Sequence, residues 1–518
     1  MSYTVGLDFG THQTKVCIED ASNPAQKIYE FIEFNDLEGN KSVLLPSIVQ
    51  INNDDTICYG FVDDNRCKTI SNVKTAKPQL ELPPEPILEL PEKPRKINNK
   101  DIPNWKNKLL HLKNKLIHKK TEYDIQMEKW IIECTEINNE YNYNLEQYKR
   151  EREQNKQVYE KSLARWKTEN LSKEHIFRYF KLATFSNYHW NYAIRPEIIS
   201  VWYLTFVFFK IQEKYGADFY IQMGVPYSTN EKYAEIQKTV AFKILISANL
   251  LISKYQNLDA FLKAKHTDLL KNTELSNYTE QDIQNYGINV MPEAFAGLRS
   301  ITQHGKLYRG MHLLVDIGGG TTDIAFFSIS DDNLPNVHVV LSFPQGLNFI
   351  FEKYLKKNDF FSIPQVQQLF KNSQKEFMSF IVMYHNSLKN KTNDMIKRVE
   401  SEFLRRQTIH GLNINKLRKA LQDMPVVYCG GGSMYNAMRI PLSYFTDVRL
   451  IDKGLLNIPY VKNKNIDISL FTILATAYGL SIQLEYEIKM TPIENIFDHL
   501  PPKEKNYDLH KEYGLEDT

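Results

Sequence analysis

Three short segments of the chain each place a glycine-rich turn directly after an apolar run. They are Val5–Lys15, Val315–Asp323 and Tyr428–Ser433. The chain has only 21 glycines, and six of them form the triplets Gly318–Gly320 and Gly430–Gly432. Glycine tolerates positive φ and lets a backbone approach a ligand closely, so a strand that ends in glycines marks a tight functional turn.

The first two segments also carry the groups that a phosphate site needs. A turn of glycines and threonines directs backbone N–H groups and hydroxyls at one spot and forms a nest for an anion. Asp8 and Asp316 would repel a phosphate there unless a cation lay between them. Mg²⁺ retains several waters and is the expected bridge, held by the two carboxylates through water. Two such turns, 308 residues apart, therefore predict a phosphate site with magnesium.

The elements that position these turns alternate along the chain. Strands are predicted at 3–9, 16–19, 46–51, 219–225, 312–317, 323–329 and 425–429. Helices are predicted at 197–214, 230–254, 347–356, 365–422 with interruptions, 434–438 and 470–485. Strands that alternate with helices indicate α/β layers, and 518 residues are too many for one core.

The bulk composition excludes several classes of protein. A hydrophobic content of 42% with 24% charged residues is typical of a folded globular protein, and a net charge of +2 gives no general attraction to nucleic acid. The five cysteines form no metal-ligand spacing, which favours a reducing compartment. No secretory signal is visible at the N-terminus, and the apolar run Val201–Phe209 is too short to span a bilayer. We expect a cytoplasmic protein.

One long segment departs from the alternating pattern. Residues Asn104–Arg195 contain neither Gly nor Pro, and an apolar stripe recurs there at spacings of three and four. Its clearest members are Met127, Trp130, Cys134, Ile137 and Tyr141. This pattern predicts an amphipathic helix, long enough for a coiled coil or a folded-back helical hairpin.

The flanks of this helical segment have distinct compositions. Six prolines lie between Pro78 and Pro94, which predicts an extended, semi-rigid connector. Lys106–Lys120 contains six lysines and no acidic residue. That run is either a solvated basic face or a contact for an anionic partner such as nucleic acid or a membrane surface.

The glycine-rich motifs together resemble those of a known superfamily. The order DFGT…K, VDIGGGTTDIA and YCGGGS is similar to the phosphate-1, phosphate-2 and adenosine motifs of the actin, 70-kDa heat-shock chaperone and sugar-kinase superfamily. PEIISVWYLTFVFFKIQEKYGADFYIQMGVPYSTNE and NVMPEAFAGL resemble chaperone segments. The resemblance covers residues 3–77, 185–350 and 425–485, and the helical insertion matches no part of the superfamily core. It implies two duplicated ribonuclease-H-like lobes with ATP or ADP and Mg²⁺ between them.

The resemblance also assigns roles to individual residues. Asp8 and Asp316 would organise Mg²⁺ and water, and Glu293 would orient the attacking water. Lys15 and Lys74 compete for the terminal phosphate. His12 stands where the superfamily usually has a small or hydroxyl residue. The remaining residues implied in nucleotide contact are Gly10, Thr11, Gly318, Gly319, Gly320, Thr321, Thr322, Gly430, Gly431, Gly432 and Ser433.

The predicted domain map follows from the motifs and the insertion. The first lobe comprises 1–77 and 185–310, with the connector and the coiled-coil insertion at 78–184. The second lobe is 311–469, a C-terminal helix at 470–490 packs back on the first lobe, and 491–518 is a polar tail. The resemblance implies a Mg-ATP-driven switch without a peptide-clamp domain, whose protein partner binds the insertion at 101–175. The alternatives are a filament-forming or segregation ATPase, which would self-associate, and a small-molecule kinase.

Overall fold

The computed structural model divides the chain into two compact units. One comprises residues 1–71 and 172–518, and the other comprises residues 72–171. The structure describes residues 3–496 except for 24–25, 69–77, 95–108, 110–121, 171–174, 187, 191, 227–230, 276, 303–306, 308, 330–334, 359–360, 362, 411–412, 453–455, 457 and 484–488. Lys74, the tail beyond residue 496, and the basic run 106–120 apart from Leu109 therefore lie outside the described residues.

A six-stranded mixed sheet forms the centre of the first lobe. Five of its strands follow the order β3-β2-β1-β10-β11, and the short strand β6 (Leu45–Pro46) pairs with β2. β1, β2 and β3 are antiparallel neighbours, whereas β1, β10 and β11 run parallel. The bounds are β1 Tyr3–Asp8, β2 Gln13–Asp20, β3 Ile28–Phe31, β10 Phe219–Val225 and β11 Ile288–Pro292.

The second lobe repeats this topology. The order β14-β13-β12-β15-β16 again joins three antiparallel strands to parallel ones, and β17 extends the sheet beside β14. The bounds are β12 Gly310–Ile317, β13 Thr322–Ile329, β14 Pro335–Phe343, β15 Pro425–Cys429, β16 Asp447–Leu450 and β17 Lys489–Met490. The predicted two-lobed α/β fold with duplicated sheets is confirmed.

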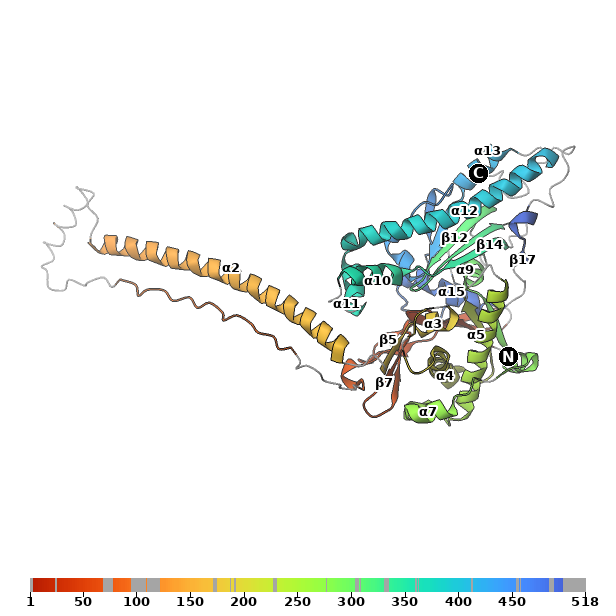
Figure 1. Ribbon diagram of the computed structural model, residues 1–518, viewed down its shortest axis with the longest axis horizontal. Coiled ribbons are helices and arrows are strands. Elements are labelled where there is room, and N and C mark those ends of the chain that lie inside the picture. Colours follow the sequence, from red (N-terminus) through yellow and green to blue (C-terminus); the bar gives the residue numbers. More distant parts are fainter. Residues whose placement is uncertain are drawn as a thin grey trace. The chain divides into compact units, whose positions relative to one another are not determined.

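Two helices lie between the sheets and connect the lobes (Figure 1). α9 (Glu293–Thr302) and α15 (Phe471–Ser481) pack against each other, and α15 also packs on β1 and β2. Their backbones approach closely because Gly479 has no side chain: a Cβ there would lie 1.8 Å from the carbonyl oxygen of Ala296. The C-terminal helix thus packs on the first lobe, but it ends at Ser481 rather than 490, and β17 joins the second sheet.

The other helices pack around the two sheets (Figure 1). In the first lobe they are α3 (Phe180–Phe185), α4 (Pro196–Tyr215), α5 (Glu231–Ser253), α6 (Leu258–Leu262), α7 (His266–Asn272) and α8 (Glu280–Asn285). In the second lobe they are α10 (Leu347–Lys357), α11 (Ile363–Asn372), α12 (Met378–His410) and α13 (Ile414–Asp423). Residues 434–438, predicted as a helix, form only short 3-10 turns.

Two of these helices are strongly apolar. Val201–Phe209 is buried within α4, as expected for a core helix. Ala234–Ser253 of α5 is the one described helix with the length and composition to cross a membrane, and about half of that stretch is buried inside the protein. Since α5 packs along α4, its apolar composition is accounted for by burial in the lobe.

The second unit contains one long helix and an extended segment beside it. α2 runs from Glu122 to Asn170. The proline-rich segment lies antiparallel along it, because Trp130 Nε1 donates to the carbonyl oxygen of Pro91 at 3.0 Å and Asn155 Nδ2 to that of Glu81 at 3.2 Å. The described part of the insertion thus has a single helix whose apolar stripe is half-buried beside prolines, and the predicted coiled coil is not confirmed.

The predicted end of the insertion at residue 184 is wrong. β9 (Ile176–Arg178) pairs with β7 (Ile48–Ile51), which in turn pairs with β8 (Ile57–Tyr59). The helix α3 that follows packs on α4. No Gly or Pro lies between α2 and β9. The sequence pattern therefore did not indicate the residue at which the chain returns to the first lobe.

Candidate functional site

The two glycine turns join equivalent strands of the two sheets and face a common pocket. The first connects β1 to β2 and the second connects β12 to β13. The pocket has a volume of about 700 Å³, within the range of small-molecule sites. Of the residues predicted from the sequence, those that line it are Asp8, Gly10, Thr11, His12, Lys15, Glu293, Asp316, Gly318, Gly319, Thr321, Gly430 and Gly431.

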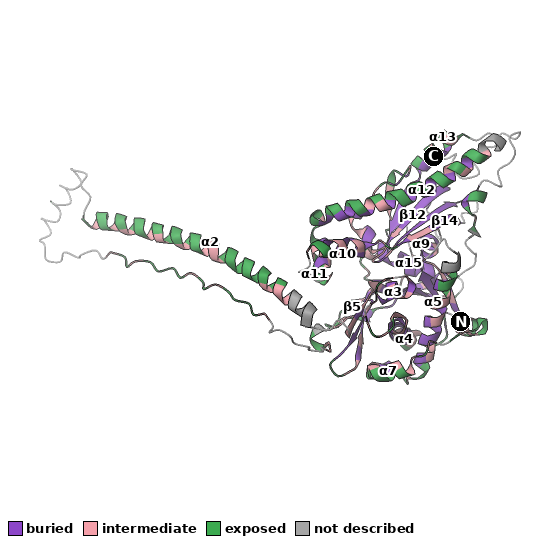
Figure 2. Cartoon of the chain, in the orientation of Figure 1, coloured by how far each residue is buried: buried purple, intermediate pink, exposed green. Residues whose placement is uncertain are grey.

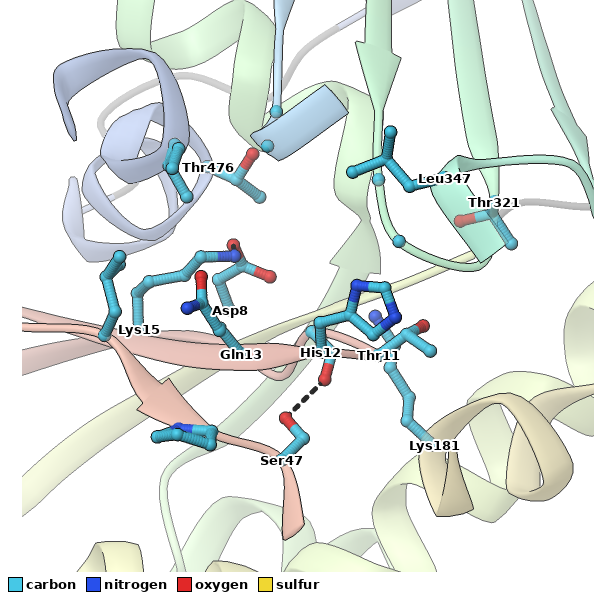
Figure 3. Close-up of a pocket in the computed structure, with 18 of the residues that line it drawn as sticks. Asp8, Thr11, His12, Gln13, Lys15, Ser47, Lys181, Thr321, Leu347 and Thr476 are labelled. Carbon is cyan, nitrogen blue, oxygen red and sulfur yellow. Dashed lines mark hydrogen bonds and ion pairs between the residues drawn. The ribbon is translucent and has the colours of Figure 1, made fainter. Parts of the chain in front are cut away.

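The first turn is internally neutralised. Asp8 and Lys15 are directly opposite each other on β1 and β2, and Lys15 Nζ donates to Asp8 Oδ2 at 2.7 Å. Both side chains are about nine-tenths buried, so the ion pair lies in the floor of the pocket (Figure 3). The Ser47 hydroxyl donates to the carbonyl oxygen of Gly10 at 2.6 Å and fixes the turn from the link between β6 and β7.

The second turn carries two acids where the first has an acid and a base. Asp316 lies opposite Asp323 on β12 and β13. Burial, together with the charges of Asp8 and Glu293, raises the pKa of Asp316 to about 6. Burial and the charges of Glu293 and Asp316 raise the pKa of Asp323 well above its usual value. A cation placed between these carboxylates would relieve their repulsion.

The third glycine loop supports the second turn. Gly430 follows β15 with φ of +83°, and a Cβ there would lie 2.1 Å from Asp316 Oδ1. Only glycine therefore fits at this position, on both conformational and steric grounds. The Thr476 hydroxyl on α15 donates to Asp316 Oδ2 at 3.2 Å, which holds this carboxylate from the opposite side.

A buried lysine that sequence reasoning missed also reaches the pocket. Lys181 on α3 forms an ion pair with Glu293, the first residue of α9, and both are more than nine-tenths buried. Burial disfavours the ammonium, yet the charges of Glu293, Asp8 and Asp323 raise the pKa of Lys181 above its usual value. Lys181 thus brings to the pocket a positive charge like the one predicted for Lys74, which lies outside the described residues. The available signal was its isolated charge within the short apolar helix FKLATF.

His12 extends from the first turn against the second lobe. A Cβ on Gly319 would lie 2.5 Å from its Nδ1, and its ring stacks on Phe351 with centroids 6.5 Å apart. Burial, with the charges of Arg178 and Lys15, lowers the pKa of His12 to about 4. The imidazole is therefore neutral at pH 7, and it fills the space left by the absent side chain of Gly319.

Four predicted contact residues do not line the pocket. Gly320 and Gly432 lie outside it. The hydroxyl of Thr322 donates to the carbonyl oxygen of Gln345 at 2.6 Å, and Ser433 donates to that of Cys429. The predicted ligand contacts of Thr322 and Ser433 are therefore corrected: both hydroxyls are buried and stabilise the ends of the loops instead.

Further residues at the far end of the pocket come from two elements. Met434 and Tyr435 follow the third glycine loop, and Gln367 and Lys371 come from α11. A Cβ on Gly431 would meet nothing within 4 Å, so its backbone borders open space. This end combines an aromatic ring, a thioether, an amide and an ammonium, which suits a flat polar ring system. Sequence analysis did not identify these four residues.

The donor set fits a hydrated magnesium ion. Within the described parts of the chain, no group of three acidic, histidine or cysteine residues is close enough to enclose a metal ion. Mg²⁺ is commonly held by one or two carboxylates, waters and substrate phosphates rather than by a cage of side chains. Asp316 and Asp323 would hold such an ion through its waters at the floor of the pocket, beside the Asp8–Lys15 ion pair, and the glycine turns would face the phosphates.

Comparison with known proteins gives only distant matches. No family profile and no curated protein matches the chain. Similar solved structures include MreB5 of Spiroplasma citri bound to ADP and bound to AMPPNP. Each is 11% identical to this chain and is aligned over 92% of this chain and 95% of its own, with TM-scores of 0.38 and 0.39 respectively.

Proposed function

We propose that the chain binds Mg-ATP in this pocket, hydrolyses it to ADP and phosphate, and uses the bound nucleotide to control closure of its two lobes. The observation that carries the proposal is the pair Asp316–Asp323, two opposed carboxylates with raised pKa values beneath glycine turns from both lobes. Such a pair is costly for an empty protein, and a cation with phosphates offsets that cost.

The chain's own residues supply what phosphoryl transfer requires. The two glycine turns hold the phosphates from opposite lobes, and Lys15 and Lys181 place positive charge beside them. Bound Mg²⁺ neutralises phosphate charge and acts as a Lewis acid. Glu293 orients the attacking water and accepts its proton, while Lys181 holds the Glu293 carboxylate in position.

Lobe closure follows from the location of these groups. Glu293 is the first residue of α9, which packs on α15 between the two sheets. Asp8 belongs to the first sheet and Asp316 to the second. A nucleotide that contacts both turns therefore favours the arrangement in which the sheets approach each other.

Thermal unfolding with and without Mg-ATP tests the proposal. A ligand at 100 times its Kd should stabilise the folded protein by about 2.7 kcal/mol, and Asp316→Asn should remove that gain. Asp259→Asn is the matched control, since Asp259 is exposed on α6. Unchanged melting of the wild-type protein at saturating Mg-ATP would reject the assignment.

Filament assembly is the second candidate function within this class. Light scattering distinguishes it from a monomeric switch, because only a polymer would scatter more when Mg-ATP is added. For the switch, residues 101–175 remain the proposed segment that binds a protein partner. A small-molecule kinase, the third possibility, would transfer phosphate to an acceptor other than water.

A further inference from the structure

Arg178 is a cation of the nucleotide pocket that no carboxylate neutralises among the described residues. The strands of the two central sheets are largely buried, and exposed residues lie mainly on the helices (Figure 2). Lys15 and Lys181 line the pocket but form ion pairs with Asp8 and Glu293. Arg178 lines the same pocket and is partly exposed, and within the described ranges its guanidinium forms neither an ion pair nor a hydrogen bond. Its charge is therefore available to an anionic ligand.

Arg178 lies beside the end of the pocket where the two glycine turns meet. It is the last residue of β9 and is opposite Ile48 on β7. Ser47, directly before β7, holds the first turn through the carbonyl oxygen of Gly10. Burial lowers the pKa of His12 most, and the charge of Arg178 lowers it further. Since the ring of His12 packs against the second turn, the charge of Arg178 acts on the space between the two turns.

The backbone directly after Arg178 has a conformation that bulky residues rarely adopt. Tyr179 has a φ of +60° and a ψ of 18°, in the left-handed region. An aromatic residue there is strained, and residues of this kind cluster at functional sites. The ring of Tyr179 is held between His12 and Tyr188, whose centroids are 5.7 and 6.0 Å away. This turn joins β9 to α3, and both Arg178 before it and Lys181 after it line the pocket.

We infer that Arg178 is a further catalytic residue, whose guanidinium binds the terminal phosphate of ATP. This inference rests on the proposed function of the pocket. Lys181, three residues after Arg178, is paired with Glu293, the residue proposed to orient the attacking water. Arg178 therefore approaches the side on which the terminal phosphate would be attacked. A guanidinium presents two parallel N–H donors, which fit two oxygens of one phosphate, and this one shares its charge with no carboxylate of the described chain.

The charge of Arg178 has a defined use in hydrolysis. The oxygen of water forms a bond to the terminal phosphorus while the bond from that phosphorus to the bridging oxygen breaks. One proton of the water passes to Glu293, and the bonding electron pair leaves with ADP. Arg178 stabilises the negative charge on the outer oxygens of the transferring group. Because ADP lacks the terminal phosphate, Arg178 should strengthen the binding of ATP but not of ADP.

Nucleotide affinities and single-turnover rates of Arg178 variants test this role. Arg178→Ala and Arg178→Gln both remove the charge, and the glutamine keeps part of the stem within β9. In both, the Kd for a Mg-bound non-hydrolysable ATP analogue should rise at least about tenfold, while the Kd for Mg-ADP stays within about twofold. The single-turnover rate with ATP should fall by about 10²- to 10³-fold. Arg178→Lys should recover much of the affinity but little of the rate, because an ammonium lacks the planar pair of donors.

Two other cations provide matched controls. Lys371→Ala removes the pocket-lining ammonium on α11, at the far end of the pocket, and should weaken the ATP analogue and ADP by the same factor. Arg195→Ala removes an exposed arginine of the first lobe and should leave both affinities and the rate unchanged. Melting of each variant with and without Mg-ADP shows whether the pocket is folded. The glutamine variant decides the matter where Arg178→Ala does not fold.

Two results would overturn the role of Arg178. One is equal weakening of the ATP analogue and ADP in the Arg178 variants, and the other is an unchanged single-turnover rate. A wild-type protein that binds both nucleotides, together with Arg178 variants that match it, would reject this role and leave the proposed function in place. A wild-type protein that binds neither nucleotide would reject the proposed function and this inference with it.

Discussion

The two phosphate turns share one architecture and differ in one charge. In each, an aspartate at the end of the first strand faces a residue seven positions later on the second strand. That residue is Lys15 in the first lobe and Asp323 in the second. The first turn is therefore neutral by itself, whereas the second has two carboxylates, and the pKa of both is raised.

The two turns occupy equivalent positions in the two lobes, but this difference in charge gives them different roles. A neutral pair such as Asp8–Lys15 is stable in an empty pocket and needs no further ion. The pair Asp316–Asp323 is destabilising until a cation arrives, so affinity for Mg²⁺ should depend mainly on the second lobe.

The largest expected effect comes from making the second turn like the first. Asp323→Lys would place an ammonium opposite Asp316 and occupy the space proposed for Mg²⁺. We expect Mg-dependent nucleotide stabilisation to vanish and single-turnover hydrolysis to fall by at least about 10³-fold. The empty protein should melt no lower than the wild type, which distinguishes loss of the cation site from misfolding. Retained magnesium dependence would show that the second turn does not hold the ion.

Of the two lysine–carboxylate pairs that line the pocket, the next experiment tests Lys181–Glu293. Glu293→Gln keeps the shape and removes the charge that orients water, so turnover should fall by about 10²-fold while Mg-ATP still raises the melting temperature. Lys181→Ala should reduce turnover similarly, because Glu293 loses its partner. Single-turnover rates with radiolabelled ATP measure both. Normal turnover in Glu293→Gln would return this residue to a purely structural role at the start of α9.

The sequence predicted the turns but not the contents of the space between them. Strand–glycine patterns are local, so Asp8, Asp316 and Gly430 could be placed from neighbouring residues alone. Lys181 could not, because its meeting with Glu293 spans 112 positions and depends on β9 returning to the first lobe. Thr322 and Ser433 have the right chemistry, but the hydroxyls of Thr322 in β13 and of Ser433 in the 3-10 turn after β15 both donate to backbone carbonyls instead.

In unit 72–171, too, the sequence predicted a local feature but not the distant segment that packs against it. The apolar stripe on α2 was visible from its spacing, and a second helix was the natural partner to expect. The structure places prolines beside that stripe instead, since an extended segment with few N–H donors can also cover an apolar helix face. Periodicity identified the buried side of the helix but not the element that covers it.

The pH dependence of stability should reveal the charge of the second turn. Asp316 binds its proton up to a pH of about 6 in the folded state but only to about 4 when unfolded. The folded state thus binds more protons between these values, and this group's contribution to stability falls as pH rises through that window. Asp316→Asn should therefore stabilise the empty protein more at pH 7 than at pH 4.5.

Urea unfolding of the wild type and of Asp316→Asn at both pH values measures this effect. The difference between the two proteins is the relevant quantity, because His12, whose pKa is lowered to about 4, changes stability in the opposite direction. Because Asp316 is partly exposed to solvent, which screens its charge, the gain should be about 1–2 kcal/mol. An equal gain at both pH values would contradict a raised pKa.

The smallest expected effect concerns His12, a side chain of the first turn that packs against the second turn. Its ring occupies the space that the absent side chain of Gly319 leaves, and Tyr188 Oη donates to Glu352 Oε1 at 3.1 Å across the same lobe boundary.

His12→Ala removes the ring but no charge at pH 7, so lobe closure should become less favourable while the reacting groups stay in place. We expect KM for ATP to rise a few-fold, about 1 kcal/mol, with kcat nearly unchanged. His12→Gln, which keeps much of the volume, should restore KM, and steady-state hydrolysis of the three proteins decides the matter. A large loss of kcat in His12→Ala would mean that the imidazole acts on the phosphate itself and that the first turn also participates in the chemistry.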